Sequence, residues 1–256
     1  MLLLIAILLL NSFIVNSKVI ELNNTNFITI RGQINEDTTN QFFIDINKVK
    51  TDDDINIFIN SPGGSVMEGL KIVNYIEMLN EDYNVNCITD FSASMAFVIL
   101  QSCKNRYAMS SSIMMQHQMS LSTGGNLFNI HSYLNMIDDM NVNIDKKQAE
   151  RIGLEYNDFV NKITNDWWIY GEKGKEYNIV DDIVNIKCNK DIISKYEKLS
   201  YLTFLGKIEY TFYRCPLIRH PKSFKFNRNI NESDYNKLNN LFNNEYYYSL
   251  LGSSLV

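Results

Sequence analysis

Apolar residues recur along the chain with the two spacings that distinguish strands from helices. Short apolar runs bounded by Asn, Gly or Pro predict strands, and apolar residues three or four positions apart predict helices. The predicted strands are residues 27–32, 55–59, 85–89, 107–109 and 113–115. The predicted helices are residues 38–49, 66–79, 94–103 and 127–152. Because strands and helices alternate, the pattern predicts an α/β domain with a largely parallel sheet.

The start of the chain departs from this alternation. Residues 2–10 are a continuous apolar run, which is shorter than the roughly 20 residues of a membrane-spanning helix and resembles the apolar part of a secretory signal peptide. We therefore expect residues 1–17 to be a signal peptide that leads to secretion, to the secretory pathway or to the lumen of an organelle. No positive charge precedes the run, so a buried first strand or an uncleaved anchor is the alternative.

The end of the chain also differs from the rest. Residues 190–256 are rich in Tyr, Phe and Asn, and their strand and helix signals are weak. We expect one domain over residues 18–189, followed by an irregular C-terminal extension to which the sequence assigns no chemistry.

Composition narrows the classes of partner. The chain has 256 residues, 45% of them hydrophobic, and a formal net charge of −5. No block of Lys or Arg suggests a nucleic-acid-binding surface, so no nucleic-acid partner is expected. The four cysteines show no metal-ligand spacing, and we expect neither a metal nor another cofactor. Cys87 and Cys103 lie in apolar runs and are expected to be small buried hydrophobes, whereas a disulfide between Cys188 and Cys215 is left open.

Two segments place reactive groups where a strand is followed by a helix. Gly63 and Gly64 follow the strand at 55–59, and they either form a tight connection or leave backbone N–H groups open, as in an oxyanion hole. Ser94 lies between a strand and an apolar helix. Its hydroxyl either caps that helix or acts as a nucleophile, which the amides and dipole of a helix N-terminus favour.

His117 and Asp166 are the other candidates for chemistry. His117 closes the strand at 113–115 and is the only histidine in the predicted core region. Asp166 precedes Trp167 and Trp168, so its carboxylate is either a helix cap or a buried partner for a cation or an imidazole. Taken alone, each residue has a common structural explanation.

Four blocks in order along the chain resemble the ClpP peptidase family. They are residues 59–64 (Ile-Asn-Ser-Pro-Gly-Gly), 93–95 (Ala-Ser-Met), 115–118 (Met-Gln-His-Gln), and Asn-Asp at 165–166 with Glu-Tyr-Asn-Ile-Val-Asp at 176–181. The interval between His117 and Asp166 needs no gap, and the similarity covers about residues 26–186. Four ordered blocks are far more specific than any one of them.

The resemblance implies a crotonase-like α/β fold, a spiral of ββα units in which residues 127–152 form a long oligomerisation helix. It also implies a serine endopeptidase that hydrolyses peptide bonds. In that family, Ser94 would be the nucleophile, His117 the general base and Asp166 the residue that fixes the imidazole tautomer.

Further positions follow from the same resemblance. The amides of Gly64 and Met95 match the oxyanion hole, and Gly63 belongs with the substrate-binding positions. The segment around Gly124 and Gly125 would be an edge strand that pairs with an extended peptide substrate. The implied partners are a peptide or unfolded protein as substrate and copies of the chain in a heptameric ring.

The chain departs from the family pattern at three positions. Ala96 replaces a glycine beside the nucleophile, Met119 replaces a proline, and Asn165 replaces an arginine whose charge helps two rings engage. An AAA+ unfoldase partner is left open, because a secretory leader would separate the chain from it. The alternatives are a catalytically silent ClpP-like scaffold or gating subunit in a mixed ring, and a crotonase-fold enzyme acting on acyl-CoA.

Overall fold

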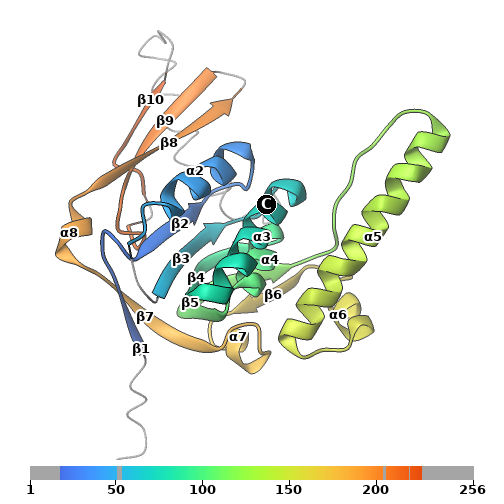
Figure 1. The fold of residues 1–256 in the computed structure, drawn as a ribbon, viewed down its shortest axis with the longest axis horizontal. Helices are drawn as coiled ribbons and strands as arrows, with labels where there is room; N and C mark the ends of the chain where they lie inside the picture. Colours follow the sequence, from blue (N-terminus) through green and yellow to red (C-terminus); the bar gives the residue numbers. More distant parts are fainter. Residues whose placement is uncertain (1–17, 51–53, 204–205, 219, 227–256) are drawn as a thin grey trace, which may run out of the picture.

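The computed structural model describes residues 18–50, 54–203, 206–218 and 220–226. The expected signal peptide at 1–17 and the end of the expected extension at 227–256 lie outside the described residues. The described chain forms a mostly parallel seven-stranded sheet with helices, together with a separate three-stranded sheet (Figure 1). This is the α/β class that the alternating pattern predicts.

The larger sheet contains strands from both ends of the main domain. Its strands are β1 (Lys18–Leu22), β2 (Phe27–Arg31), β3 (Asp54–Ser61), β4 (Asn84–Ala93), β5 (Asn105–Gln116), β6 (Trp167–Tyr170) and β7 (Asp182–Cys188). The helices are α2 (Glu36–Ile46), α3 (Val66–Asp82), α4 (Met95–Ser102), α5 (Leu127–Ile152), α6 (Tyr156–Lys162), α7 (Lys173–Glu176) and α8 (Lys190–Ile193). The smaller sheet consists of β8 (Tyr196–Thr203), β9 (Gly206–Tyr213) and β10 (Ser223–Phe226).

The strand order of the larger sheet is β1-β7-β5-β4-β3-β2, with parallel pairing throughout this path. β6 lies off the path and pairs antiparallel with the end of β5. Ile57 and Ile59 of β3 belong to the core that contains α3 and α4, whereas Phe58 belongs to a second core with β1 and β7. Because both faces of the central strands are covered, these strands appear in the sequence as nearly continuous apolar runs.

Most predicted elements are present, and two differences have local causes. The helix predicted at 38–49 begins earlier, because the Asn35 side chain accepts a hydrogen bond from the Thr38 amide and caps α2. The strands predicted at 107–109 and 113–115 are one strand, β5. The Ser112 hydroxyl donates to the carbonyl oxygen of the neighbouring strand β4, so a polar residue is satisfied inside the sheet.

Regular structure continues beyond residue 190, where the sequence predicts an irregular extension. β8, β9 and β10 pair antiparallel, and Ile208, Tyr210 and Phe212 of β9 alternate toward a buried side. A disulfide between Cys188 and Cys215 joins the end of β7 to the residues after β9. The strand signal is weak because aromatic, charged and other polar residues are mixed along β8 and β9.

A second disulfide corrects the expectation that Cys87 and Cys103 are separate buried hydrophobes. Both residues are buried, but their sulfur atoms are bonded, with 5.7 Å between the Cα atoms. The parallel strand β4 and the residue that follows α4 meet here, a contact that the sequence spacing does not reveal.

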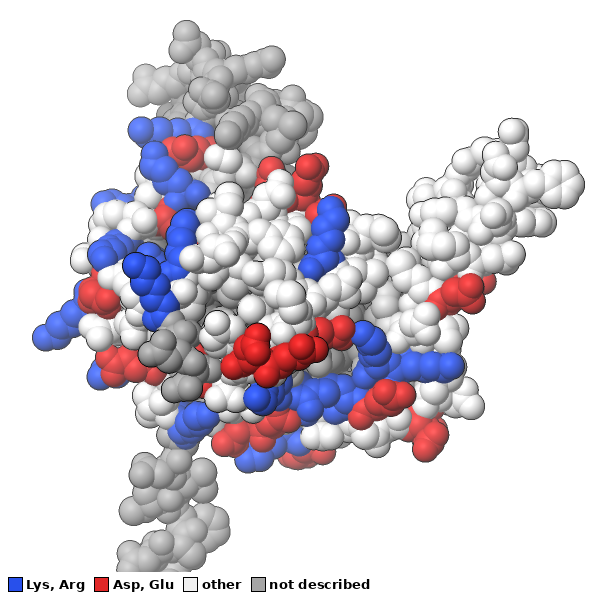
Figure 2. Space-filling view, in the orientation of Figure 1, with Lys and Arg blue, Asp and Glu red and all other residues white. Residues whose placement is uncertain are grey.

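Helix α5 projects from the body of the molecule (Figure 1). Its C-terminal turns pack on the domain, whereas Leu127 and Phe128 at its start are 64% and 84% exposed. Figure 2 shows charged residues of both signs spread over the body, while the projecting end of α5 is uncharged. None of the described helices is both long and apolar enough to cross a membrane.

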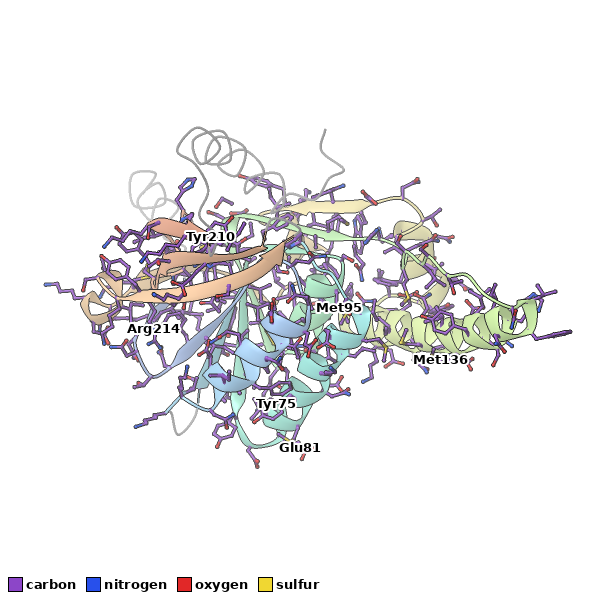
Figure 3. All side chains as sticks on the ribbon, turned by 90° about the horizontal axis from the view of Figure 1, so that it is seen from above. Tyr75, Glu81, Met95, Met136, Tyr210 and Arg214 are labelled. Carbon is purple, nitrogen blue, oxygen red and sulfur yellow. A yellow bond between two sulfur atoms is a disulfide. The ribbon has the colours of Figure 1, made fainter. Side chains whose placement is uncertain are left out.

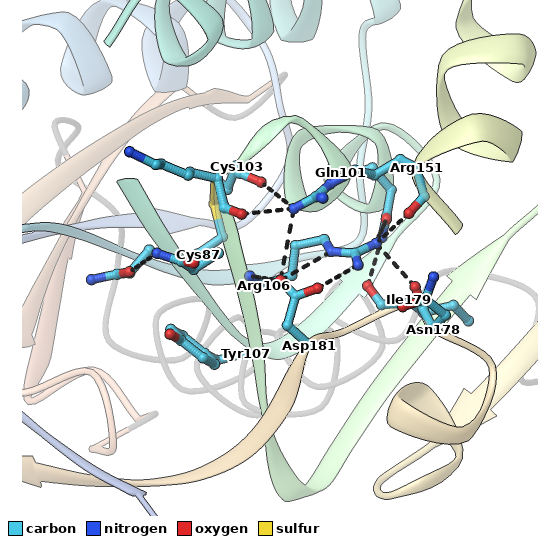
Figure 4. Close-up of polar contacts among 12 residues, drawn as sticks. Cys87, Gln101, Cys103, Arg106, Tyr107, Arg151, Asn178, Ile179 and Asp181 are labelled. Atoms are coloured by element: carbon cyan, nitrogen blue, oxygen red, sulfur yellow. Dashed lines mark hydrogen bonds and ion pairs between the residues drawn. A yellow bond between two sulfur atoms is a disulfide. The ribbon is translucent and has the colours of Figure 1, made fainter. Parts of the chain in front are cut away.

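A cluster of polar groups around the buried Arg106 holds the start of β5 against the segment before β7 (Figure 4). The Arg106 side chain is almost completely buried and pairs with Asp181 through two of its nitrogen atoms. Its remaining donor group contacts the Gln101 side chain at 2.8 Å and the Asn178 carbonyl at 3.0 Å. Since β5 ends at the candidate site, this cluster helps to fix the strand that carries His117.

Candidate active site

Ser94 joins β4 to α4 in a strained backbone conformation. Its φ is 54° and its ψ is −123°, a region that costs a non-glycine residue about 1–3 kcal/mol. The Ser94 amide donates to the Met115 carbonyl at 2.9 Å, and the Ser94 carbonyl accepts from the amide of Phe97. The Ser94 side chain makes no capping hydrogen bond to α4, so its hydroxyl is not used as a helix cap.

The Ser94 hydroxyl instead faces His117, the residue after β5. The distance between Ser94 Oγ and His117 Nε2 is 2.8 Å, which is a hydrogen-bond distance. With Nε2 unprotonated, the hydroxyl donates to the ring. The preceding residue, Gln116, is buried and donates to the Gln148 side chain on α5 at 2.6 Å, which ties the end of β5 to that helix.

Asp166 lies opposite His117 because of the pairing of β5 with β6. Gln116 pairs with Trp167 at the end of this antiparallel ladder. His117, which follows β5, and Asp166, which precedes β6, therefore lie opposite each other. The distance from His117 Nδ1 to Asp166 Oδ1 is 4.0 Å, which is longer than a hydrogen bond. The two side chains are 31% and 41% exposed, so both have room to move.

The loop at Gly63 and Gly64 lies directly against Ser94. Both glycines have positive φ, 91° and 148°, and a Cβ on Gly63 would stand 2.5 Å from the Ala93 carbonyl oxygen. Only glycine lets the loop approach Ser94 this closely. The described residues provide no hydrogen-bond acceptor for the amides of Gly64 and Met95. The amide of Met95 is the first of helix α4.

A small cavity of about 110 Å³ opens beside these groups. Gly64, Ser94, Met95 and His117 line one side of it, and side chains of α5 line the other. In Figure 3, Met95 lies on the side of the central helices that faces α5. The cavity therefore brings together the hydroxyl, the imidazole and two backbone amides.

Asp145 on α5 also lines this cavity, and the sequence analysis did not identify it. The residue is 5% exposed. Burial raises the pKa of the Asp145 carboxyl to about 6, and a hydrogen bond from the Asn141 side chain partly opposes that rise. The spacing of residues along α5 could have identified Asp145 from the sequence. Asn141, Asp145 and Ala149 are four residues apart, so they share the side of the helix that packs on the domain.

Gly124 and Gly125 are not part of this arrangement. Residues 117–126 lie outside the strands, and no heavy atom lies within 4 Å of a Cβ built on either glycine. Their pairing with a substrate stays a prediction. His131 is exposed on α5 and does not line the cavity.

A family model and two curated relatives all point to the same family. A family model described as Clp protease matches residues 14–187. The ATP-dependent Clp protease proteolytic subunit 3 of Streptomyces coelicolor is 31% identical over 133 residues, which are 51% of this chain and 61% of that protein. The ATP-dependent Clp protease proteolytic subunit 1 of Streptomyces avermitilis is 29% identical over 167 residues, 61% of this chain and 74% of that protein. The first match thus spans less than two thirds of the relative's length.

Proposed function

This chain belongs to the Clp protease family, and from that premise we propose that it is a serine peptidase with Ser94 as nucleophile, His117 as general base and Asp166 as the residue that orients the imidazole. The observation that carries the proposal is the contact of 2.8 Å between Ser94 Oγ and His117 Nε2. A structural serine at this position would cap α4, and the Ser94 hydroxyl does not.

The geometry supports an acyl-transfer mechanism in two steps. In the first step His117 Nε2 takes the hydroxyl proton while Ser94 Oγ bonds to the scissile carbonyl carbon. His117 then gives that proton to the leaving amine, and an acyl-enzyme ester on Ser94 remains. In the second step His117 takes a proton from water, the resulting hydroxide attacks the ester, and the proton returns to Ser94.

The negative charge that develops on the carbonyl oxygen needs donors close to Ser94. The amides of Gly64 and Met95 line the same cavity as the hydroxyl, and the N-terminal end of α4 adds a favourable dipole. Asp166 must approach His117 Nδ1 by roughly 1 Å to accept its proton in a hydrogen bond. Hydrogen bonds of catalytic groups are often long before substrate is bound, and the exposure of both side chains permits this closure.

The same proposal covers assembly, substrate and compartment. We propose that copies of the chain form a ring, and the exposed Leu127 and Phe128 on the projecting part of α5 support a contact between copies. The proposed substrate is a peptide or an unfolded protein. The two cysteine pairs that lie within bonding distance and the apolar run at residues 2–10 support an oxidising, secretory compartment.

The test is covalent labelling of the full chain with a fluorophosphonate, with the modified peptide located by mass spectrometry. We expect the label on Ser94, none on Ser94→Ala, and a loss of peptide hydrolysis on the order of 10⁴-fold in that variant. Ser120→Ala is the matched control, because Ser120 lines the same cavity but the hydrogen bond to the imidazole comes from Ser94, so Ser120 should not carry the label. Labelling of Ser120 rather than Ser94, or no labelling at all, would contradict the proposal.

A further inference from the structure

The cavity beside Ser94 continues along α5. A second cavity, of about 320 Å³, shares Met119, Asn141 and Asp145 with the first. The space next to the nucleophile is therefore larger than the first cavity alone, and Asp145 stands where the two meet.

Asp145 is an unusual residue for this position. It is 95% buried, and in the described part of the chain its side chain accepts one side-chain hydrogen bond, from Asn141 Nδ2 at 3.0 Å. No Lys or Arg lines either cavity in the described part of the chain. The hydrogen bond from Asn141 offsets only part of the desolvation cost of this carboxylate, and a cation that enters the cavity would offset more of it.

The other groups around Asp145 do not replace this missing cation. The end of β5 contributes Gln116, the loop that follows contributes His117, Met119 and Ser120, and α6 contributes Tyr156. α5 itself adds Asp138, a second acidic residue, to the lining of the larger cavity. The field in the cavity is thus negative, and His117 is the one group facing it that can become positive.

We propose that Asp145 determines specificity by binding the ammonium or guanidinium group of a Lys or Arg side chain on the acyl side of the scissile bond. This inference rests on the proposed peptidase function. The cavity opens at Ser94 Oγ and beside the amides of Gly64 and Met95, so the residue whose carbonyl is attacked has the shortest path for its side chain into it. An uncharged side chain of the same length fills the space but leaves the carboxylate unpaired, which makes it the poorer substrate.

The experiment compares two peptidyl aryl phosphonates that differ only in the residue next to phosphorus, lysine in one and norleucine in the other. Norleucine matches the lysine chain but lacks the ammonium group. We expect the lysine probe to label the full chain at least about tenfold faster at pH 8, the range of a charge-assisted hydrogen bond. In Asp145→Asn this ratio should fall to near one.

Asp139→Asn is the matched control, since it removes the same charge from an exposed position of α5 outside both cavities. It should keep the parent ratio. A second measurement uses the parent chain alone: the ratio should decline as the pH falls through about 6, where the Asp145 carboxyl becomes protonated. The same pH series on Asp145→Asn measures any contribution of His117 to the ratio, because both groups line the same cavity, and in that variant the decline through pH 6 should be absent.

The outcomes separate this inference from the function on which it rests. A fluorophosphonate, which carries no such side chain, should label Ser94 in the parent chain. If it does, and the lysine and norleucine probes react equally, the specificity role of Asp145 is wrong and the peptidase proposal stands. A ratio that is unchanged in Asp145→Asn also overturns the role of Asp145. Absence of fluorophosphonate labelling overturns both proposals.

Discussion

Ser94 has a strained backbone at the position that we propose for the nucleophile. Its positive φ turns the hydroxyl away from the amides of α4 and toward His117, and the hydrogen bond from its amide to the Met115 carbonyl holds it there. A strained backbone conformation persists only where the surrounding contacts hold the residue in place, and such residues are frequent at functional sites. The backbone conformation that destabilises the fold at Ser94 is therefore the same one that directs its hydroxyl toward His117.

Replacement of Ser94 by glycine should therefore stabilise the protein relative to replacement by alanine. Both variants lack the hydroxyl, but only glycine relieves the strained φ, and this gain exceeds the larger unfolded-state entropy of glycine. We expect Ser94→Gly to be about 1 kcal/mol more stable than Ser94→Ala in urea unfolding. At the exposed Ser120 the same pair of substitutions should show no advantage for glycine. An alanine variant as stable as the glycine variant would refute the role of strain at Ser94.

At the scale of elements, the position of β5 sets the distance between His117 and Ser94. The strand begins at the Arg106 cluster and ends next to His117. Burial opposes ionisation of Asp181, but the hydrogen bonds from Arg106 outweigh it and lower the pKa of the Asp181 carboxyl. Arg151, whose Nη2 lies 3.7 Å from Asp181 Oδ2, adds a second positive charge.

Asp181→Asn should destabilise the fold in a pH-dependent way. Removal of the carboxylate leaves the buried Arg106 unpaired, and the loss is expected to be about 1–2 kcal/mol at pH 7, less than for a fully buried pair because Asp181 is 36% exposed. The pKa of the Asp181 carboxyl is lower in the folded protein than the ordinary Asp value of about 4. The carboxylate therefore stabilises the parent fully above about pH 4. This stabilisation is lost as the pH falls through the folded-state pKa.

Urea unfolding of the parent and of Asp181→Asn between pH 3 and pH 8 measures this difference. The two stabilities should converge at the acidic end. Asp182→Asn is the control, because its partner Lys175 is largely exposed and such a pair contributes little. An offset between parent and Asp181→Asn that stays constant down to pH 3 would exclude the ion pair as its cause.

At the scale of the whole molecule, the small sheet of β8, β9 and β10 is attached to the main domain at several points. The Arg31 guanidinium lies 4.4 Å from the centre of the Phe212 ring, and the Arg214 side chain donates to the Asn24 carbonyl at 3.0 Å. The disulfide between Cys188 and Cys215 adds a covalent link across 27 residues of sequence. None of these contacts involves the lining of the cavity at Ser94.

Loss of this disulfide should loosen the small sheet and leave the cavity at Ser94 unchanged. For the double variant Cys188→Ser, Cys215→Ser we expect a loss of about 2–4 kcal/mol in the stability of this region, because its unfolded chain is no longer constrained. Limited proteolysis should cleave residues 190–226 faster than in the parent, while fluorophosphonate labelling of Ser94 persists. Equal rates of proteolysis in the two proteins would mean that the noncovalent contacts alone hold the sheet.

The sequence by itself determined the elements of the main domain and most of the candidate site. Apolar periodicity is a local property, so it identified α3, α5 and the central strands closely. Four ordered motifs identified the family. The same motifs placed Gly64, Ser94 and His117 as candidates, and the structure brings these three residues to one cavity.

Only the tertiary structure decided the features that depend on distant segments. The register of β5 with β6 places Asp166 opposite His117, and the packing of α5 brings Asp145 to the cavity beside Ser94. The bond between Cys87 and Cys103 and the sheet after residue 190 likewise arise where separate elements meet. Local spacing contains no information on which elements meet, because strand pairing and helix packing are set by burial over the whole chain.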